Sequence, residues 1–167
     1  MTQRGHPDDQ WLLNGQPAFG YVPGGLIEAC ATTAPIYLFH GDAAQGAHHI
    51  ATKHGHWVQK NGGSVPELVW KKCHQSGKAF FNDDETRKLN LSLQLSPSAL
   101  LVLRYEPAKH FFNVVTLYYR EQAVDGDFIG RFTPDRWEGE QPQFSLRFFA
   151  PPVVIVKKKR PLVIPPP

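Results

Sequence analysis

The chain has 167 residues, of which 41% are hydrophobic and 20% charged, a composition typical of a single globular domain. No apolar run approaches the roughly 20 residues that span a bilayer, so no membrane partner is expected. The net charge of +3 is modest, but residues 53–120 hold ten Lys or Arg against five Asp or Glu. This distribution is typical of a face that binds an anion and also of a solvated basic face.

The chain begins with a segment, residues 1–35, that is rich in Gly and Pro and is expected to be mostly loop with short extended pieces. Residues 36–39 are apolar and predict a short strand. Asp42 follows a glycine and is placed to cap a helix over residues 43–54. Gly55 is expected to end that helix.

The second helix is predicted by Ser64 and Glu67, which have the spacing of a capping box, and it should run to about Gln75. Beyond it the pattern becomes extended. The leucines of residues 89–95 alternate with polar residues, as in a half-buried strand. The strands expected after the second helix are residues 78–81, 89–95, 100–106, 111–121 and 127–133.

These elements predict an α+β fold with two N-terminal helices packed on one face of an antiparallel sheet of about four to five strands, with Pro-rich ends. Residues 1–35 form the N-terminal loop-rich segment, residues 36–133 the α+β domain, and residues 134–167 a C-terminal Pro-rich extension. The extension contains the basic run Lys157–Arg160, for which contact with an anionic partner and simple solvation both stay open.

The first predicted helix carries four of the eight histidines of the chain, together with a lysine. They are His48, His49, Lys53, His54 and His56. His49 and Lys53 are four residues apart and share a helix face, whereas His54 is five from His49 and converges with it only if the helix ends there. Imidazole both accepts and donates protons near neutral pH, so the cluster predicts an acid/base site, and which histidines act stays open.

The strand predicted over residues 111–121 carries Thr116, Tyr118 and Arg120 at alternate positions, which places them on one face. Arg104 on the partner strand can join that face. Two imidazoles can move the protons of phosphodiester cleavage, cations can stabilise the charge on phosphorus, and hydroxyls can position the phosphate. The combination therefore predicts metal-independent cleavage of RNA.

The stretch Gly46–Gly55 resembles the Gly-x-x-His-Ile-x-x-(Lys/Arg)-His-Gly signature of a ribonuclease superfamily that groups barnase, EndoU, colicin-type tRNases and RelE. The similarity extends from residue 36 to about 121 and is greatest to the phage- and toxin-associated branches. This chain departs from the pattern in its doubled histidine, in His56 and in its Pro-rich ends.

The resemblance implies a helix-and-sheet fold and an endoribonuclease without metal or cofactor, which leaves a 2′,3′-cyclic phosphate. It implies His49 and His54 as the acid/base pair, Lys53 as the cation that binds phosphate, and Thr116 and Tyr118 as their partners on the strand. Arg104 and Arg120 are the further substrate-binding candidates. The implied partners are RNA, including tRNA, and an immunity or antitoxin protein, with action in the cytoplasm after delivery from another cell or a phage.

Two alternatives stay open. The chain can be a non-catalytic phage accessory or binding domain that keeps the fold, or a nuclease with a His-ligated metal to which Cys73 and His74 contribute. The spacing of these residues matches no common zinc pattern. The two cysteines, Cys30 and Cys73, form no CxxC pair, which argues against a disulfide framework, although one disulfide between them stays open.

Overall fold

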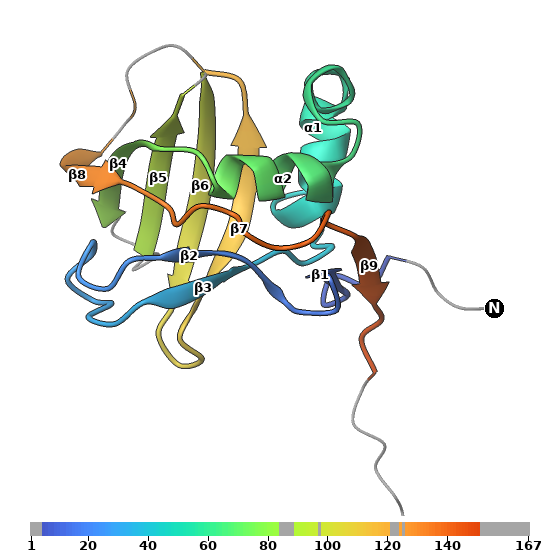
Figure 1. Ribbon diagram of the computed structural model, residues 1–167, viewed down its shortest axis with the longest axis horizontal. Coiled ribbons are helices and arrows are strands. Elements are labelled where there is room, and N and C mark those ends of the chain that lie inside the picture. Colours follow the sequence, from blue (N-terminus) through green and yellow to red (C-terminus); the bar gives the residue numbers. More distant parts are fainter. Residues whose placement is uncertain (1–4, 84–88, 97, 121–123, 125, 151–167) are drawn as a thin grey trace, which may run out of the picture.

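The computed structural model describes residues 5–83, 89–96, 98–120, 124 and 126–150. Within these residues the chain forms two helices and nine strands (Figure 1). In chain order they are β1 (Gln10–Leu13), β2 (Ala18–Val22), β3 (Ala34–Tyr37), α1 (Gly46–Asn61), α2 (Val65–Cys73), β4 (Gly77–Asp83), β5 (Leu89–Leu95), β6 (Ala99–Glu106), β7 (Phe111–Tyr118), β8 (Asp127–Phe132) and β9 (Phe144–Arg147).

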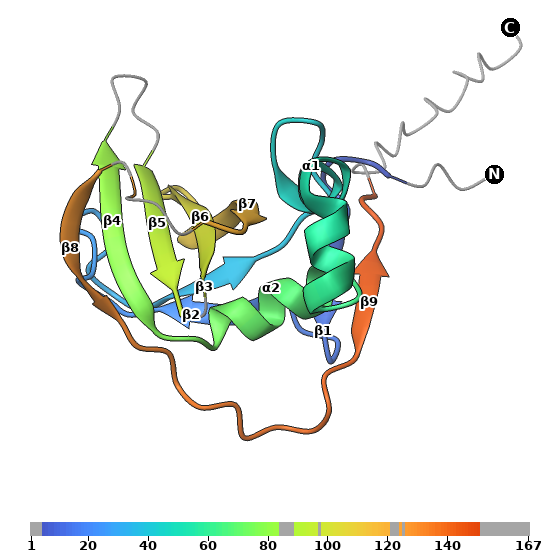
Figure 2. The same cartoon turned by 90° about the horizontal axis from the view of Figure 1, so that it is seen from above.

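Seven strands form one mixed sheet in the order β2-β3-β7-β6-β5-β4-β8, and β1 pairs with β9 in a separate two-stranded sheet. Within the large sheet only the β3–β7 pairing is parallel. Figure 2 shows that this sheet is strongly curved, with α2 near β2 and α1 beyond β7. The apolar side chains of the curved sheet and the buried side chains of both helices pack together in one core.

The predicted fold class is wrong in two respects. The helices are not N-terminal, because three strands precede them, and the main sheet has seven strands and is mixed rather than antiparallel with four to five. The N-terminal segment, expected to be mostly loop, contributes β1, β2 and the start of β3. β1 pairs with residues far away in the chain, such as Gln10 with Arg147, and β3 pairs with the distant β7, so local composition carries no sign of these pairings.

The predicted elements in the second half of the chain agree better with the structure. The alternating strand is β5 with the expected bounds, and β8 is the edge strand that residues 127–133 predicted. Ser64 is confirmed as the N-cap of α2, because its hydroxyl accepts from the Glu67 backbone N–H at 3.3 Å. The strand predicted over residues 111–121 is β7, which ends at Tyr118, so Tyr119 and Arg120 follow the strand instead of belonging to it. Residue 121 and residues 151–167, including Lys157–Arg160, lie outside the described residues.

Helix α1 differs from its prediction at both ends. It begins at Gly46 after Gln45, so Asp42 does not cap it, and it continues through Gly55 to Asn61. It is kinked at His54, whose φ of −129° and ψ of 17° are not helical. Gly55 therefore marks a bend rather than an end, because the buried Val58 beyond it anchors another turn in the core.

The position of α1 follows from the short parallel pairing of β3 with β7, which involves only Ile36 and Tyr37 of β3. Beyond that pairing β7 lies beside α1 (Figure 1). On the helix, Ala47 and Ile50 are buried in the core, with Ile50 completely inaccessible. These apolar contacts hold α1 against β7, which brings the neighbouring residues of the helix close to that strand.

Candidate active site

The loop that leads into α1 is held in shape by two glycines and an aspartate. Gly41 and Gly46 have φ of +69° and +88°, a region that other residues rarely adopt. A Cβ on Gly41 would lie 2.0 Å from the Gln45 carbonyl oxygen. The Asp42 carboxylate accepts from the Ala44 and Gln45 backbone N–H groups at 2.8 and 3.2 Å. This compact turn fixes the direction in which α1 leaves the loop.

The imidazoles of His49 and His54 meet on α1. Their ring centroids are 5.8 Å apart and the rings are nearly perpendicular, at 80°. On a straight helix, residues five positions apart lie on different faces, so these two rings would not meet. The non-helical backbone at His54 brings them together. The His49 Nδ1 lies 2.8 Å from the Ala43 carbonyl oxygen, which can only accept, so Nδ1 carries the proton and Nε2 is available for exchange.

Strand β7 supplies the surface against which His54 packs. The His54 ring stacks on Tyr118 with centroids 5.2 Å apart and an angle of 23°. Arg120 Nη1 in turn donates to the Tyr118 hydroxyl at 3.2 Å. The contacts therefore run without a break from His49 through His54 and Tyr118 to Arg120, joining four of the residues that the sequence predicted.

The environment of His54 disfavours its protonated form. Burial against the sheet lowers its pKa from the usual 6.5, and the positive charges of His49 and Lys53 lower it further. Lys53 itself is exposed on the same turn of the helix. His54 is consequently neutral near pH 7, the state required of a general base.

The β6–β7 register places the other predicted residues on the same face as Tyr118. Val102 lies opposite Thr116 and Leu103 opposite Val114, which leaves Val115 as the extra residue of a bulge. Because of this bulge, Asn113 shares a face with Thr116 although they are three positions apart. Arg104 lies opposite Asn113 on that face and donates from Nη1 to the Gln45 side chain at 2.7 Å.

A row of polar atoms on this face has no hydrogen-bond partner within the described part of the chain. Asn90, Arg104 and Asn113 are direct cross-strand neighbours on β5, β6 and β7. The atoms concerned are Asn90 Oδ1, Arg104 Nε, Asn113 Oδ1 and Thr116 Oγ1, all of them buried. Buried groups are normally paired, so these atoms are available to bond with water or with a polar ligand.

Sequence reasoning did not select Asn90, Asn113 or Gln45. The polar side of the alternating strand contains Asn90, so a weak signal existed for that residue. The place of Asn113 depends on a bulge, and that of Gln45 depends on the loop before α1, and neither has a local sequence pattern.

The other histidines of the predicted cluster lie apart from this site. The exposed His48 packs against His40 with ring centroids 5.4 Å apart, and its backbone N–H donates to the His40 carbonyl oxygen at 2.8 Å. His56 is exposed on the turn after the kink. Among the clustered histidines, His54 packs on Tyr118 of β7 and His49 contacts the His54 ring.

No group of three His, Cys, Asp or Glu side chains that could hold a metal ion is found among the described residues. Cys30 and Cys73 are both buried and both free. Burial raises the pKa of the Cys73 thiol to about 12, so it is not a thiolate near neutral pH. Neither helix of the described chain is long and apolar enough to cross a membrane.

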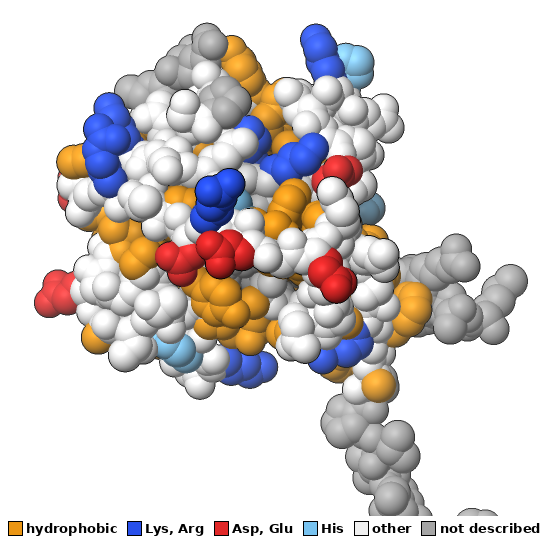
Figure 3. All heavy atoms as spheres, viewed as in Figure 1, with side chains coloured by type: hydrophobic (Ala, Val, Ile, Leu, Met, Phe, Trp, Pro, Cys, Tyr) orange, Lys and Arg blue, Asp and Glu red, His pale blue; other side chains and the backbone are white. Residues whose placement is uncertain are grey.

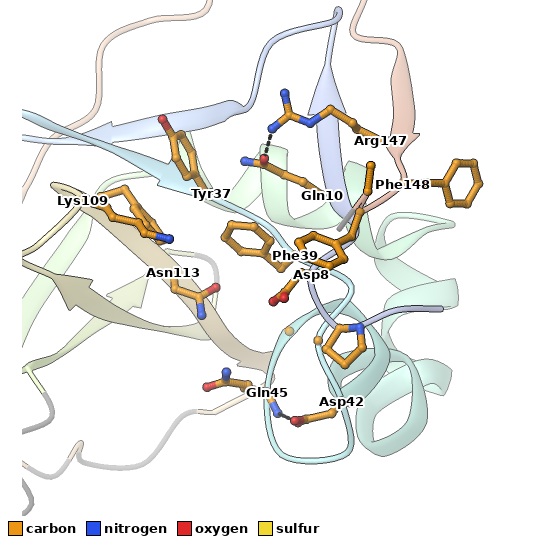
Figure 4. Close-up of a pocket in the computed structure, with 16 residues that line it drawn as sticks. Asp8, Gln10, Tyr37, Phe39, Asp42, Gln45, Lys109, Asn113, Arg147 and Phe148 are labelled. Atoms are coloured by element: carbon orange, nitrogen blue, oxygen red, sulfur yellow. Dashed lines mark hydrogen bonds between the residues drawn. The ribbon is translucent and has the colours of Figure 1, made fainter. Parts of the chain in front are cut away.

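Two hollows lie near opposite ends of β7. One hollow, of about 670 Å³, is lined by Asn113 of β7, by Gln45 of the loop before α1 and by aromatic side chains such as Phe39 (Figure 4). The other, of about 710 Å³, includes Arg120 just after β7. The rings of His49 and His54 line neither of these two hollows.

Comparisons of the chain with protein family models, with curated proteins and with solved structures found no match. The resemblance to the barnase, EndoU, colicin and RelE superfamily therefore rests on the motif that contains His49 and His54.

Proposed function

We propose that this protein is a metal-independent endoribonuclease that cleaves RNA by acid/base chemistry of His49 and His54. The observation that carries the proposal is the contact between the two imidazoles, one of which stacks on Tyr118 of β7. The motif resemblance and the excess of cations over residues 53–120 support it. The resemblance also suggests a toxin or phage effector that acts in the cytoplasm, tRNA as the first substrate to test, and an immunity or antitoxin protein as partner.

In the proposed reaction, neutral His54 accepts the proton of the ribose 2′-hydroxyl, and the 2′-oxygen attacks the adjacent phosphorus. His49, protonated at both ring nitrogens, donates its Nε2 proton to the departing 5′-oxygen while Nδ1 stays bonded to the Ala43 carbonyl oxygen. The bond from phosphorus to the 5′-oxygen breaks, leaving a 2′,3′-cyclic phosphate and a 5′-hydroxyl. No electron transfer and no co-reactant are needed.

The cations around the pair have distinct parts in this proposal. Lys53 lies on the same turn as His54, close enough for its charge to lower the His54 pKa. Arg120, through the Tyr118 hydroxyl, and Arg104, through Gln45, are held by hydrogen bonds rather than free to move. Cations fixed in this way stabilise charge that develops on phosphorus, and the Thr116 hydroxyl and the Asn113 amide can position the phosphate oxygens.

Cleavage of a mixture of tRNAs by purified protein in excess EDTA tests the proposal, with product ends analysed for the cyclic phosphate. His49→Ala and His54→Ala should each lower the rate about 100-fold or more, the usual scale for loss of a general acid or base. His56→Ala is the matched control, because His56 is exposed on the same helix and should leave the rate unchanged.

Three outcomes contradict the proposal. Loss of cleavage in EDTA would indicate a metal nuclease. Wild-type rates in both His49→Ala and His54→Ala would remove the acid/base pair. RNA binding without cleavage at high protein concentration would indicate a binding domain that keeps the fold.

A further inference from the structure

The hollow beyond the end of β7 brings together three cations from different parts of the chain. Lys78 comes from β4, Arg131 from β8 and Arg120 from the residues that follow β7. Serine hydroxyls line it as well, among them Ser76 and Ser98. No carboxylate is among the described residues that line it, which makes the hollow suited to an anion.

The strand register places Lys78 directly opposite Arg131 on antiparallel strands. Like charges directly opposite each other on neighbouring strands are destabilising, and an anion bound between them offsets that repulsion. On its other side Lys78 faces Gln94 of β5, which carries no charge. Within the described residues the structure gives neither Lys78 nor Arg131 an ion pair. Figure 3 shows Lys and Arg side chains over the β4–β8 edge of the molecule.

An aromatic pair, one ring of which is exposed, lies beside these cations on the same face of the sheet. Phe80 is two residues from Lys78 on β4 and is paired with Phe128 of β8. Their rings meet edge to face with centroids 5.8 Å apart, and Phe128 remains 59% exposed. A large exposed ring next to a cationic hollow is the combination with which proteins bind single-stranded nucleic acids, because bases stack on the ring while phosphates meet the cations.

The hollow shares one residue with the candidate active site. Arg120 lines it and donates to Tyr118, on which His54 stacks. We propose that this hollow binds a backbone phosphate of a single RNA strand and that Phe128 stacks on a neighbouring base. The identification of the bound nucleic acid as RNA rests on the proposed function. The bound RNA would run across the sheet from His54 toward β8.

The test is the binding of a fluorescent 2′-O-methyl oligoribonucleotide, which lacks the reacting hydroxyl, by fluorescence anisotropy over a range of salt concentrations. Lys78→Ala and Arg131→Ala should each reduce the slope of log affinity against log salt by about 0.7, the value for one phosphate contact on a single strand. Lys60→Ala and Arg136→Ala, which change exposed cations outside the hollow, are the matched controls and should keep the wild-type slope.

A separate variant tests the proposed stacking of a base on Phe128. Phe128→Ala should weaken binding about tenfold, within the range found for loss of one base–aromatic stack, at an unchanged salt slope. Tyr21→Ala is the control, because Tyr21 is similarly exposed, at 56%, but lies on β2. A 2′-O-methyl duplex of the same sequence should bind more weakly than the single strand. Equal binding of the duplex would overturn the single-strand assignment.

The two proposals fail separately. If the wild-type protein cleaves RNA but the Lys78→Ala/Arg131→Ala double variant keeps the wild-type salt slope, the phosphate site is overturned and the ribonuclease assignment stands. If the wild-type protein binds the oligonucleotide through Lys78 and Arg131 but cleaves no RNA, the site stands and the ribonuclease assignment falls. Absence of any binding by the wild-type protein overturns the site.

Discussion

Replacing Gly46 by alanine is expected to destabilise the protein and disturb the start of α1. Gly46 has φ of +88°, and this conformation costs an L-residue about 1–2 kcal/mol. A Cβ would also lie 2.9 Å from the Gly41 Cα and 2.9 Å from the Phe39 carbonyl oxygen, both backbone atoms that cannot rotate away. Forced shifts of this kind cost about 1–3 kcal/mol more. The free energy of unfolding should therefore fall by about 2–5 kcal/mol.

Thermal unfolding followed by circular dichroism measures this loss, which corresponds to a decrease of about 10 °C in Tm for a chain of this size. Gly25→Ala is the matched control. Gly25 also has a positive φ, +82°, but a Cβ there meets nothing within 4 Å. It should lose only the conformational part, about 1–2 kcal/mol. Equal losses in the two variants would show that the close contacts of the loop before α1 do not constrain the helix, and would refute the reasoning.

Three further predictions concern α1 and β7. Because the His54 pKa is lowered, the folded protein binds this proton more weakly than the unfolded chain does. The acid limb of the kcat/KM profile should therefore have its midpoint below pH 6.5, and the contribution of His54 to stability should be lost as pH falls through that region. A midpoint above pH 6.5 would contradict the role of His54 as the base. Tyr118→Phe keeps the stack but removes the hydroxyl that accepts from Arg120 Nη1. Denaturant unfolding should therefore show a loss of about 1 kcal/mol, together with slower cleavage, and unchanged stability and rate would show that this hydrogen bond has no part in the site. Gly55→Ala should raise the free energy of unfolding by about 1 kcal/mol, because a Cβ there meets nothing within 4 Å and alanine favours the helix, and a lower stability would show that the kink requires glycine.

The candidate site was only partly predictable. The motif around His49 and the alternation of Thr116 and Tyr118 selected residues that the structure places on α1 and on the facing strand. The convergence of His49 with His54 depends on a kink inside a helix that continues to Asn61. The row from Asn90 to Asn113 depends on strand register and on a bulge, which arise from pairing between distant segments.

Local chemistry alone determined the start of α2, the alternating strand β5 and the concentration of imidazoles with a lysine, because caps, periodicity and side-chain proton exchange act within a few residues. The tertiary structure decided the mixed seven-stranded sheet, the pairing of β1 with the distant β9, and which of the clustered histidines stacks on β7. These features depend on hydrogen bonds and apolar contacts between segments far apart in the chain. Such contacts form only when the chain folds and brings those segments together.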